Sequence, residues 1–278
     1  MKSVETRRGK TMKTAVKQVV RQDCGDVWLE KDLDLIREEP LSIRIQGKPY
    51  TVVMRTPGHE LDHVAGFCLG EGLVDSSDDF STLGYCDEDV NVVTATLTAE
   101  RQALVAALID RRGFISQTSC GICGKELVDD LKQRIHRLDR GSDLDIMTVI
   151  RSMDSLSDHQ PLRNRTRAAH GAVLFDRDGA PLSAAEDVGR HNALDKATGR
   201  LFLEGRLQDA AYLVLSSRAS YEMIQKAARA GIRSVFALSR PTALAVSLAG
   251  DLGMTLACPD GTNGLYVFTG DFRLGGAG

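Results

Sequence analysis

The first half of the chain alternates between strand-like and helix-like patterns of apolar positions. In LSIRIQGKPYTVVMRTP (41–57), isoleucines alternate with polar residues and a glycine supplies a turn, which predicts a β-hairpin. The next segment, HELDHVAGFCLGEGLV (59–74), has apolar residues at helical spacing. A second strand pair is expected over 82–98, where β-branched residues gather, and a helix over 100–110.

From Ala168 onward, apolar runs of strand length alternate with amphipathic segments. This alternation predicts an α/β fold with right-handed crossovers and helices on the faces of the sheet. The polar stretch at 138–145 marks a boundary, so we expect an N-terminal α+β lobe over 23–140 and a larger α/β lobe over 141–278. The expected strands are AHGAVLFD, YLVLSSR, SVFALSR, MTLAC and GLYVFT, and the expected helices are HNALDKATGRLFLEG, YEMIQKAARAG and TALAVSLAGDLG.

Charge and hydropathy exclude several classes of function. The chain has 278 residues, with 35 basic and 38 acidic side chains, and its formal charge of −3 gives no electrostatic case for nucleic acid or an anionic membrane. No apolar run is long enough to cross a bilayer. Residues 1–22 are basic and lack the apolar core of a signal peptide, so we expect a flexible arm there and a cytoplasmic protein.

The cysteines do not form a disulfide scaffold, because there are only six in a long chain without an export signal. Cys68 lies in the apolar pattern of a helix and is expected in the core. Only Cys120 and Cys123 form a motif, in SCGICGK (119–125). The remaining cysteines are isolated in sequence: Cys24, Cys86 and Cys258.

The CxxC pair is placed where a loop opens into a helix, and this favours chemistry over a purely structural role. A helix N-terminus and the nearby Lys125 both favour a thiolate. Two thiols at this spacing can share a metal, a disulfide or a transferred sulfur. A redox dithiol stays an alternative, although thioredoxin-like motifs follow the first strand of a βαβ unit. A zinc site would need two further ligands.

The segment HELDH (59–63) matches the HExxH pattern of zinc proteases by letter. His59 falls at the expected helix start, directly after Pro-Gly, and no third ligand motif follows, so we reject a protease. A zinc ion held by His59, His63, Cys120 and Cys123 is an outside alternative.

Polar residues gather where three expected strands end. Ligands of open α/β sheets bind beyond the carboxyl ends of strands, and helix N-termini favour phosphate. The alternative is that these residues only cap helices and close turns. Spacing alone does not decide between ligand binding and a capping or turn-forming role. The cluster in AAEDVGRHNALDK contains Glu186, Asp187, Arg190, His191, Asn192, Asp195 and Lys196; Ser216, Ser217 and Arg218 end the strand YLVLSSR; His170 opens AHGAVLFD; and CPDGTN (258–263) forms a turn.

Taken together, these segments resemble the formate dehydrogenase accessory sulfurtransferase family. The similarity runs from about Ile43 to Phe268. Several separated motifs in one order are far more specific than a CxxC pair. The segments that carry the resemblance are GFCLGEGLV, SCGICGK, EDVGRHNALDK, SSRASYEMIQKAA and PTALAVSLA.

The resemblance implies a cytidine-deaminase-like mixed sheet without the deaminase zinc site and without a resident metal. It implies a sulfurtransferase that accepts persulfide sulfur from a cysteine desulfurase. The sulfur passes to bis-molybdopterin guanine dinucleotide, the form of the molybdenum cofactor needed by formate dehydrogenase or a related molybdenum or tungsten enzyme. GDP is expected to mimic this bound substrate. No nucleic acid or membrane partner is implied, and a homodimer stays open.

By resemblance, Cys120 carries the persulfide and Cys123 is its partner. The chain departs from the family where Thr166-Arg167-Ala168 replaces Thr-Gly-Gly and where Ser217 replaces a glycine. The segment 257–262, expected to be a turn, lacks the family's usual arginines. The implied cofactor-binding residues are His170, Asp187, Arg190, His191, Ser217, Arg218, Ala257, Cys258, Pro259, Asp260, Gly261 and Thr262.

Two other functions compete with sulfur transfer. A dithiol oxidoreductase would require both Cys120 and Cys123, whereas a sulfur carrier could keep some function without Cys123. A cofactor-binding chaperone without enzymatic activity would survive the loss of both cysteines.

Overall fold

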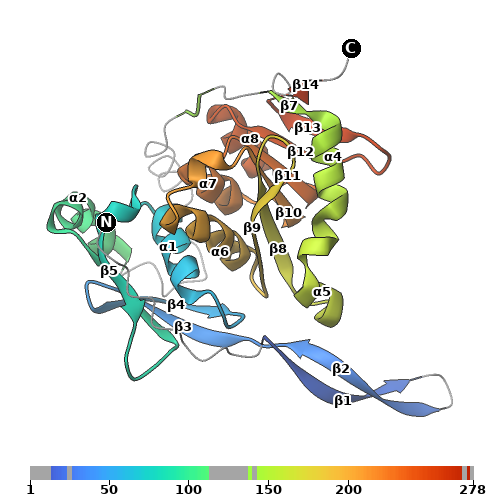
Figure 1. Cartoon of the computed structure of the whole chain (residues 1–278), viewed down its shortest axis with the longest axis horizontal. Coiled ribbons are helices and arrows are strands. Elements are labelled where there is room, and N and C mark those ends of the chain that lie inside the picture. The colour runs from blue at the N-terminus through green and yellow to red at the C-terminus, as the bar shows by residue number, and fades with distance from the viewer. Residues whose placement is uncertain (1–13, 24–26, 113–136, 140–142, 271–273, 276–278) are drawn as a thin grey trace.

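The computed structural model describes residues 14–23, 27–112, 137–139, 143–270 and 274–275 (Figure 1). Its largest element is a six-stranded mixed sheet with the order β13-β12-β11-β10-β8-β9. The neighbours β10, β11 and β12 are parallel, and the other pairings are antiparallel. The strands are β8 (His170–Phe175), β9 (Pro181–Asp187), β10 (Tyr212–Arg218), β11 (Ser234–Ser239), β12 (Thr255–Pro259) and β13 (Leu265–Thr269).

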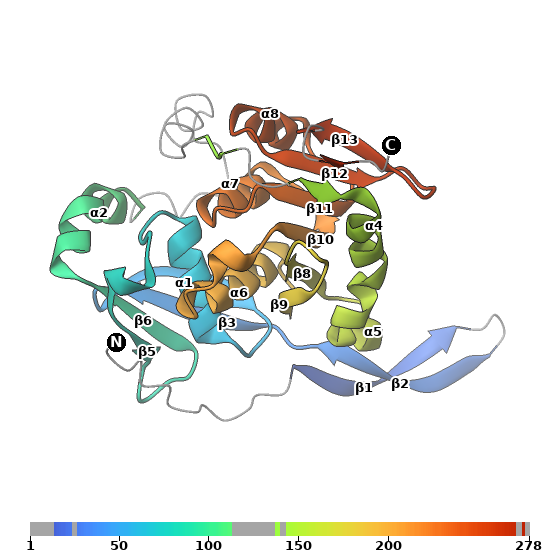
Figure 2. The ribbon, with the colours of Figure 1, turned by 45° about the horizontal axis from the view of Figure 1, so that its top comes forward.

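Helices cover both faces of this sheet, as the alternating pattern predicted. Side chains of β10 show the division, because Leu213 and Leu215 pack into the large core while Tyr212 and Val214 pack into a second cluster with Val149 of α4. The large core lies under α6, α7 and α8 (Figure 2). The helices of this lobe are α4 (Ile146–Asp154), α5 (Pro161–Thr166), α6 (Arg190–Leu203), α7 (Tyr221–Arg229) and α8 (Ala243–Asp251).

The N-terminal lobe contains a four-stranded sheet with the order β4-β3-β6-β5. Leu41, Ile43 and Ile45 alternate inward from β3 and are fully or almost fully buried. The hairpin, the second strand pair and both helices expected from the sequence are present. Their bounds are β3 (Glu39–Ile45), β4 (Lys48–Arg55), α1 (Glu60–Gly70), β5 (Phe80–Tyr85), β6 (Val92–Leu97) and α2 (Ala99–Arg112).

The prediction of a flexible N-terminal arm was wrong for the second part of that segment. Residues 15–22, expected to be flexible, lie in β1 (Ala15–Asp23), which pairs antiparallel with β2 (Trp28–Ile36). The two strands form a long hairpin that projects from the body (Figures 1 and 2). The β-branched residues Val16, Val19 and Val20 of β1 were the signal that the argument from charge overlooked. A short parallel pair, β7 (Leu144–Asp145) with β14 (Leu274–Gly275), completes the described strands.

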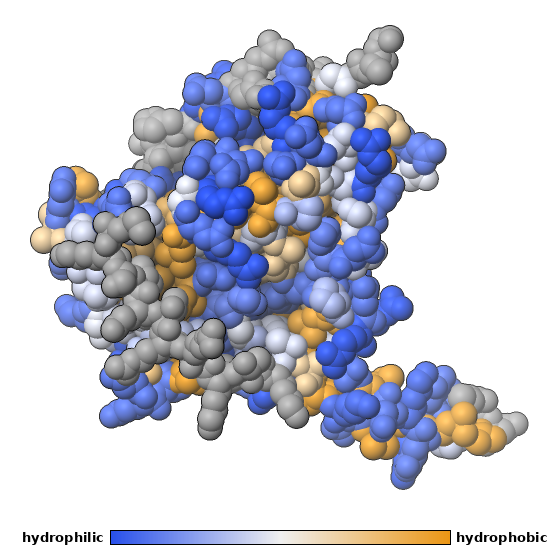
Figure 3. All heavy atoms as spheres, viewed as in Figure 1, coloured by the Kyte–Doolittle hydropathy of each residue, from blue (hydrophilic) through white to orange (hydrophobic). Residues whose placement is uncertain are grey.

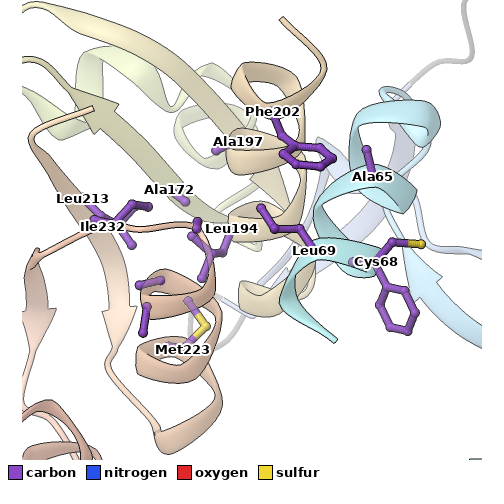
Figure 4. Packing of buried hydrophobic residues seen from close by; sticks show 14 of the residues in the cluster. Ala65, Cys68, Leu69, Ala172, Leu194, Ala197, Phe202, Leu213, Met223 and Ile232 are labelled. Atoms are coloured by element: carbon purple, nitrogen blue, oxygen red, sulfur yellow. The ribbon is translucent and has the colours of Figure 1, made fainter. Parts of the chain in front are cut away.

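The two lobes share one apolar core across α1 and α6. Ala65 and Leu69 of α1 belong to one apolar cluster with Leu194, Ala197 and Phe202 of α6 (Figure 4). Cys68 belongs to this core, as its position in the helical pattern predicted. The lobes therefore do not have separate interiors, and the polar stretch at 138–145 separates them only in sequence.

Glycines set the distance between α1 and α6. A Cβ on Gly199 would lie 1.8 Å from the Asp62 carbonyl oxygen, and a Cβ on Gly66 would lie 2.0 Å from the Asp195 carbonyl oxygen. Both clashing atoms belong to the backbone, so a side chain could be accommodated only by moving the helices apart. None of the helices in the described part of the chain is long and apolar enough to span a membrane.

Gly199→Ala should destabilise the protein by about 3 kcal/mol or more, because the added methyl group overpacks a backbone contact. For a chain of this size, that cost lowers the melting temperature by about 6–12 °C. Gly84→Ala is the matched control, since a Cβ there meets nothing within 4 Å. Calorimetry of the three proteins checks this. Equal melting temperatures for the parent and Gly199→Ala would contradict the proposed helix contact.

Candidate functional site

The topology brings the predicted strand ends to one edge of the six-stranded sheet. His170 opens β8 and pairs with Asp187, the last residue of β9. The Gly171 N–H donates to Ser216 Oγ over 2.8 Å, which ties this corner to β10. Because β12 runs parallel to β10 through β11, Pro259 ends at the same edge. The predicted convergence of three groups at one edge is confirmed.

Asp187 lies at the centre of this corner, and its carboxylate is fully buried. Lys196 Nζ contacts Oδ2 at 2.7 Å, and the Thr56 N–H donates to the same oxygen over 3.0 Å. The other oxygen, Oδ1, accepts from the Gly189 N–H and from Asn192 Nδ2. Asp187 therefore positions other groups rather than facing solvent.

Lys196 and Asn192 extend the network from α6 to the N-terminal lobe. Lys196 Nζ also donates to the Thr56 carbonyl over 2.7 Å, and Asn192 Nδ2 donates to the Met54 carbonyl over 2.8 Å. The Val188 N–H donates to Thr56 Oγ1 over 3.1 Å. Part of the polar cluster predicted from the sequence is therefore structural, because its buried polar groups form hydrogen bonds with one another and with the backbone.

Arg190 of the cluster and Arg163 of α5 place positive charge near His170, and we call this region the basic corner. Burial lowers the pKa of His170, and the positive charges of Arg190 and Arg163 lower it further. The imidazole is therefore neutral at neutral pH. Its Nδ1 is buried without a hydrogen-bond partner among the described residues. The corner offers cationic groups and an unused ring nitrogen in a chain that is acidic overall.

His191 and Glu222 join the N-terminal turns of α6 and α7. His191 Nε2 lies 2.8 Å from Glu222 Oε2, and the hydrogen bond from His191 lowers the pKa of Glu222. Next to this pair, Arg218 is exposed at the end of β10, whereas Ser217 is buried with its hydroxyl bonded to the Arg218 carbonyl. Of the residues predicted at this strand end, Arg218 is the one that faces solvent.

The segment 257–262 is only partly the turn that was expected. Ala257, Cys258 and Pro259 belong to β12, and the first two are buried. The turn begins at Asp260, whose Oδ1 accepts from the Thr262 N–H and hydroxyl, each over 2.7 Å. The hydrogen bonds from Thr262 lower the pKa of Asp260. Burial raises the pKa of Cys258 and makes its thiol a packing group.

Cys120 and Cys123 lie outside the described residues, so their roles stay predictions. Of the cysteines in the part of the chain that the structure does describe, Cys68 is buried, and this burial raises its pKa strongly. Cys86 is half-buried, with a free thiol. Neither Cys68 nor Cys258 has the environment of a reactive thiolate.

The HExxH segment serves the contact between the lobes. Glu60 is buried, 3.0 Å from Arg55, and accepts from the Gly58 N–H over 2.6 Å. His63 is fully buried, and this burial lowers its pKa, helped by the charges of Lys196 and Lys226. His59 is exposed at the helix start. No three His, Cys, Asp or Glu side chains within the described ranges are grouped as metal ligands.

Sequence reasoning missed Arg163 and Arg240. Arg163 of α5 adds charge near His170 and donates to the Ala169 carbonyl over 3.0 Å. The basic run RNRTR (163–167) was its signal in the sequence. Arg240 follows β11 at the same sheet edge and lies over the ring of Tyr266, 5.6 Å from its centroid. An isolated arginine after a strand gives no comparable signal.

The backbone at Arg167 bears on the family resemblance. Its φ is 59°, in the left-handed region that favours glycine, and the resemblance expected a glycine at this position. The turn before His170 thus keeps a conformation typical of glycine although the side chain is arginine.

Comparison with known proteins decides the family. The model of the FdhD/NarQ family matches residues 36–275. The chain belongs to the FdhD/NarQ family. Among curated relatives, the "Sulfur carrier protein FdhD" of Mycobacterium tuberculosis (strain ATCC 25618 / H37Rv) is 39% identical over 268 residues, covering 92% of this chain and 96% of the relative.

One further relative supports this family assignment, and one solved structure shows the fold. The "Sulfur carrier protein FdhD" of Anaeromyxobacter dehalogenans (strain 2CP-1 / ATCC BAA-258) is 37% identical over 251 residues, covering 86% of this chain and 87% of the relative. The crystal structure of a putative formate dehydrogenase accessory protein from Desulfotalea psychrophila has a TM-score of 0.75 at 21% identity, over 94% of this chain and all of that one. This likeness shows that the two chains share a fold.

Lys196→Met should cost about 3–5 kcal/mol of unfolding free energy, because it leaves the buried carboxylate of Asp187 without its cation. The matched control is Lys48→Met, which removes an exposed lysine. Urea denaturation of both variants measures the difference. Equal unfolding free energies for the two variants would show that the buried pair does not hold the corner.

Proposed function

We propose that the chain is a sulfur carrier that accepts persulfide sulfur on Cys120 from a cysteine desulfurase and passes it to bis-molybdopterin guanine dinucleotide. The observation that carries the proposal is the convergence of His170, Arg218 and the end of β12 at one sheet edge. Membership of a family whose curated relatives are named sulfur carriers supports the chemistry. The client is formate dehydrogenase or a related molybdenum or tungsten enzyme, and the compartment is the cytoplasm.

In this proposal the sheet edge binds the guanine dinucleotide part of the substrate. Arg163, Arg190 and Arg218 provide cations for the phosphates, since charge-assisted hydrogen bonds are the strong ones. The N-terminus of α6, at Gly189, adds backbone N–H donors, which also favour an anion. Asp187 and Asn192 act through the backbone they hold, so they position the site without touching the substrate.

The sulfur step belongs to Cys120 and Cys123. A thiolate at Cys120 takes the terminal sulfur of the donor persulfide, and the donor leaves as a thiolate. Attack by Cys123 on the inner sulfur of the Cys120 persulfide would release hydrosulfide and form a disulfide, which a thiol reductant returns to two thiols. The cytidine-deaminase-like arrangement is part of the same proposal, and a mixed sheet between helical layers supports it.

Incubation with a cysteine desulfurase and cysteine should add one sulfur, about 32 Da, to the Cys120 peptide, reversibly with dithiothreitol. Intact-mass and peptide mass spectrometry measure it. Cys120→Ala should abolish both the gain and client activation, and Cys123→Ala should be milder. Cys86→Ala is the control, because it removes another free thiol.

The outcomes separate the competing functions. A Cys120→Ala protein that activates its client normally would contradict the carrier and leave a cofactor-binding chaperone. Equal loss in Cys120→Ala and Cys123→Ala, with no added sulfur in the parent, would indicate a dithiol oxidoreductase.

GDP should bind the sheet edge, and Arg218→Ala should weaken it about tenfold to a hundredfold through the loss of a charge-assisted contact. Calorimetric titration measures the dissociation constants. Arg177→Ala is the matched control, because Arg177 is an exposed arginine in the β8–β9 turn at the opposite end of these strands. A parent that binds neither GDP nor the molybdenum cofactor would refute the pocket, and equal affinities of parent and Arg218→Ala would refute only that residue's role.

A further inference from the structure

Two consecutive carboxylates at the end of β9 hold helices on opposite faces of the six-stranded sheet. Successive side chains of a strand point to opposite faces. Asp187 points toward α6, and its Oδ1 accepts the Gly189 N–H at the start of that helix. Glu186 points to the other face, where Oε2 accepts the Leu162 N–H over 2.8 Å and Oε1 accepts the Arg163 N–H over 2.7 Å. Both oxygens of Glu186 therefore bind the backbone of the first turn of α5.

The helix α5 depends on Glu186 because its own N-terminal residue supplies no cap. The first N–H groups of a helix have no partner within the helix, and the side chain of Gln160 at the N-cap makes no hydrogen bond to them. Gln160 is buried and lies over Gly171, where a Cβ would meet its Nε2 at 2.6 Å. Gly171 is also the residue of β8 that pairs with Glu186. The start of α5 is therefore seated on the β8–β9 ladder at this one pair.

Each of the two helices carries an arginine to the neighbourhood of His170. Arg190 is the first residue of α6, and Arg163 lies in the first turn of α5. Both positive charges lower the pKa of His170, so both lie near its imidazole. Arg163 Nη1 also donates to the carbonyl of Ala169, the residue before His170, over 3.0 Å. Hydrophilic residues cover the surface of the body around α5 (Figure 3).

We propose that Glu186 is a positioning residue that holds Arg163 at the strand-end edge, so that Arg163 and Arg190 bind one phosphate group of the nucleotide from the two faces of the sheet. The inference rests on the proposed function, which puts the nucleotide at this edge. His170 Nδ1, buried without a hydrogen-bond partner among the described residues, marks the place of this phosphate. Glu186 does not face the phosphate, because both of its oxygens are occupied by backbone donors.

Calorimetric titration of the full chain with GDP tests this through a double-mutant cycle. Arg163→Ala should weaken GDP binding about tenfold or more, and Glu186→Gln about threefold to tenfold. Because Glu186 acts through Arg163, the double variant should bind GDP as Arg163→Ala does, within about twofold. The matched control is Asp145→Asn, which neutralises the carboxylate that caps α4 through the Thr148 N–H and should leave GDP affinity unchanged.

NMR titration of the His170 imidazole separates positioning of Arg163 from a general loss of structure. Neutralising Glu186 would by itself lower the pKa of His170, because a nearby carboxylate favours the imidazolium form. Displacing Arg163 would raise that pKa, because a cation leaves the ring. The proposal predicts a raised pKa of His170 in Glu186→Gln, as in Arg163→Ala. The charged and titratable groups that act on the ring are Arg190, Arg163, His191 and Asp187.

Glu186→Asp is the second variant, because it keeps the charge but shortens the side chain by one methylene group. It should also weaken GDP binding and raise the pKa of His170. A parent that binds no GDP would overturn the proposed function and this inference together. A parent that binds GDP, with equal affinity in the Glu186 variants or with losses that add to those of Arg163→Ala, would overturn the inference alone. An unchanged or lowered pKa of His170 in both Glu186 variants would overturn it as well.

Discussion

The buried ion pair between Asp187 and Lys196 is the interaction on which the site depends. It is placed where β9 turns into α6, and Thr56 of the N-terminal lobe bonds to both partners. A carboxylate and an ammonium group without water are tolerated only when their remaining bonding capacity is used, and here it is. The pair therefore couples the attachment of the two lobes to the shape of the sheet edge.

The same corner explains how an acidic chain could bind an anionic dinucleotide. Asp187 and Asp195 are neutralised internally, Asp195 by Lys226 at 2.9 Å. Glu186 accepts the N–H groups of Leu162 and Arg163, which caps the first turn of α5. The acidic side chains of the motif thus face inward or toward backbone donors. Arg218 remains exposed, and the local balance is basic although the formal charge of the whole chain is −3.

Much of the fold was predictable because periodicity reports burial directly. Five of the six strands and the three long helices after Ala168 were expected in order, since their apolar runs are packed between helical layers, whereas β9 was not expected. The β1–β2 hairpin was missed because its apolar residues alternate with charges and bury little. The shared core of the lobes was also missed, since the close approach of Gly66 to α6 depends on tertiary geometry.

For the site, the motifs located the polar residues but did not show which of them face a ligand and which hold the structure together. In the sequence, Asp187, Asn192 and Lys196 were candidate ligand-binding groups. In the structure they bond to Thr56 and Met54 of the N-terminal lobe and so have a structural role. His170 and Asp187 lie 17 residues apart in sequence, and only the pairing of β8 with β9 brings them together. Pairings between distant strands carry this information, and local patterns do not.

Hydrogen–deuterium exchange of the intact protein with and without GDP tests the central claim most directly, namely that the substrate dinucleotide binds at the strand-end edge supported by the buried pair. The account predicts slower exchange with GDP in segments 187–192 and 217–221, at the starts of α6 and α7. The β8–β9 turn at 176–180, at the far end of the same strands, should be unchanged. Protection of that turn, with none at the two helix starts, would contradict the account.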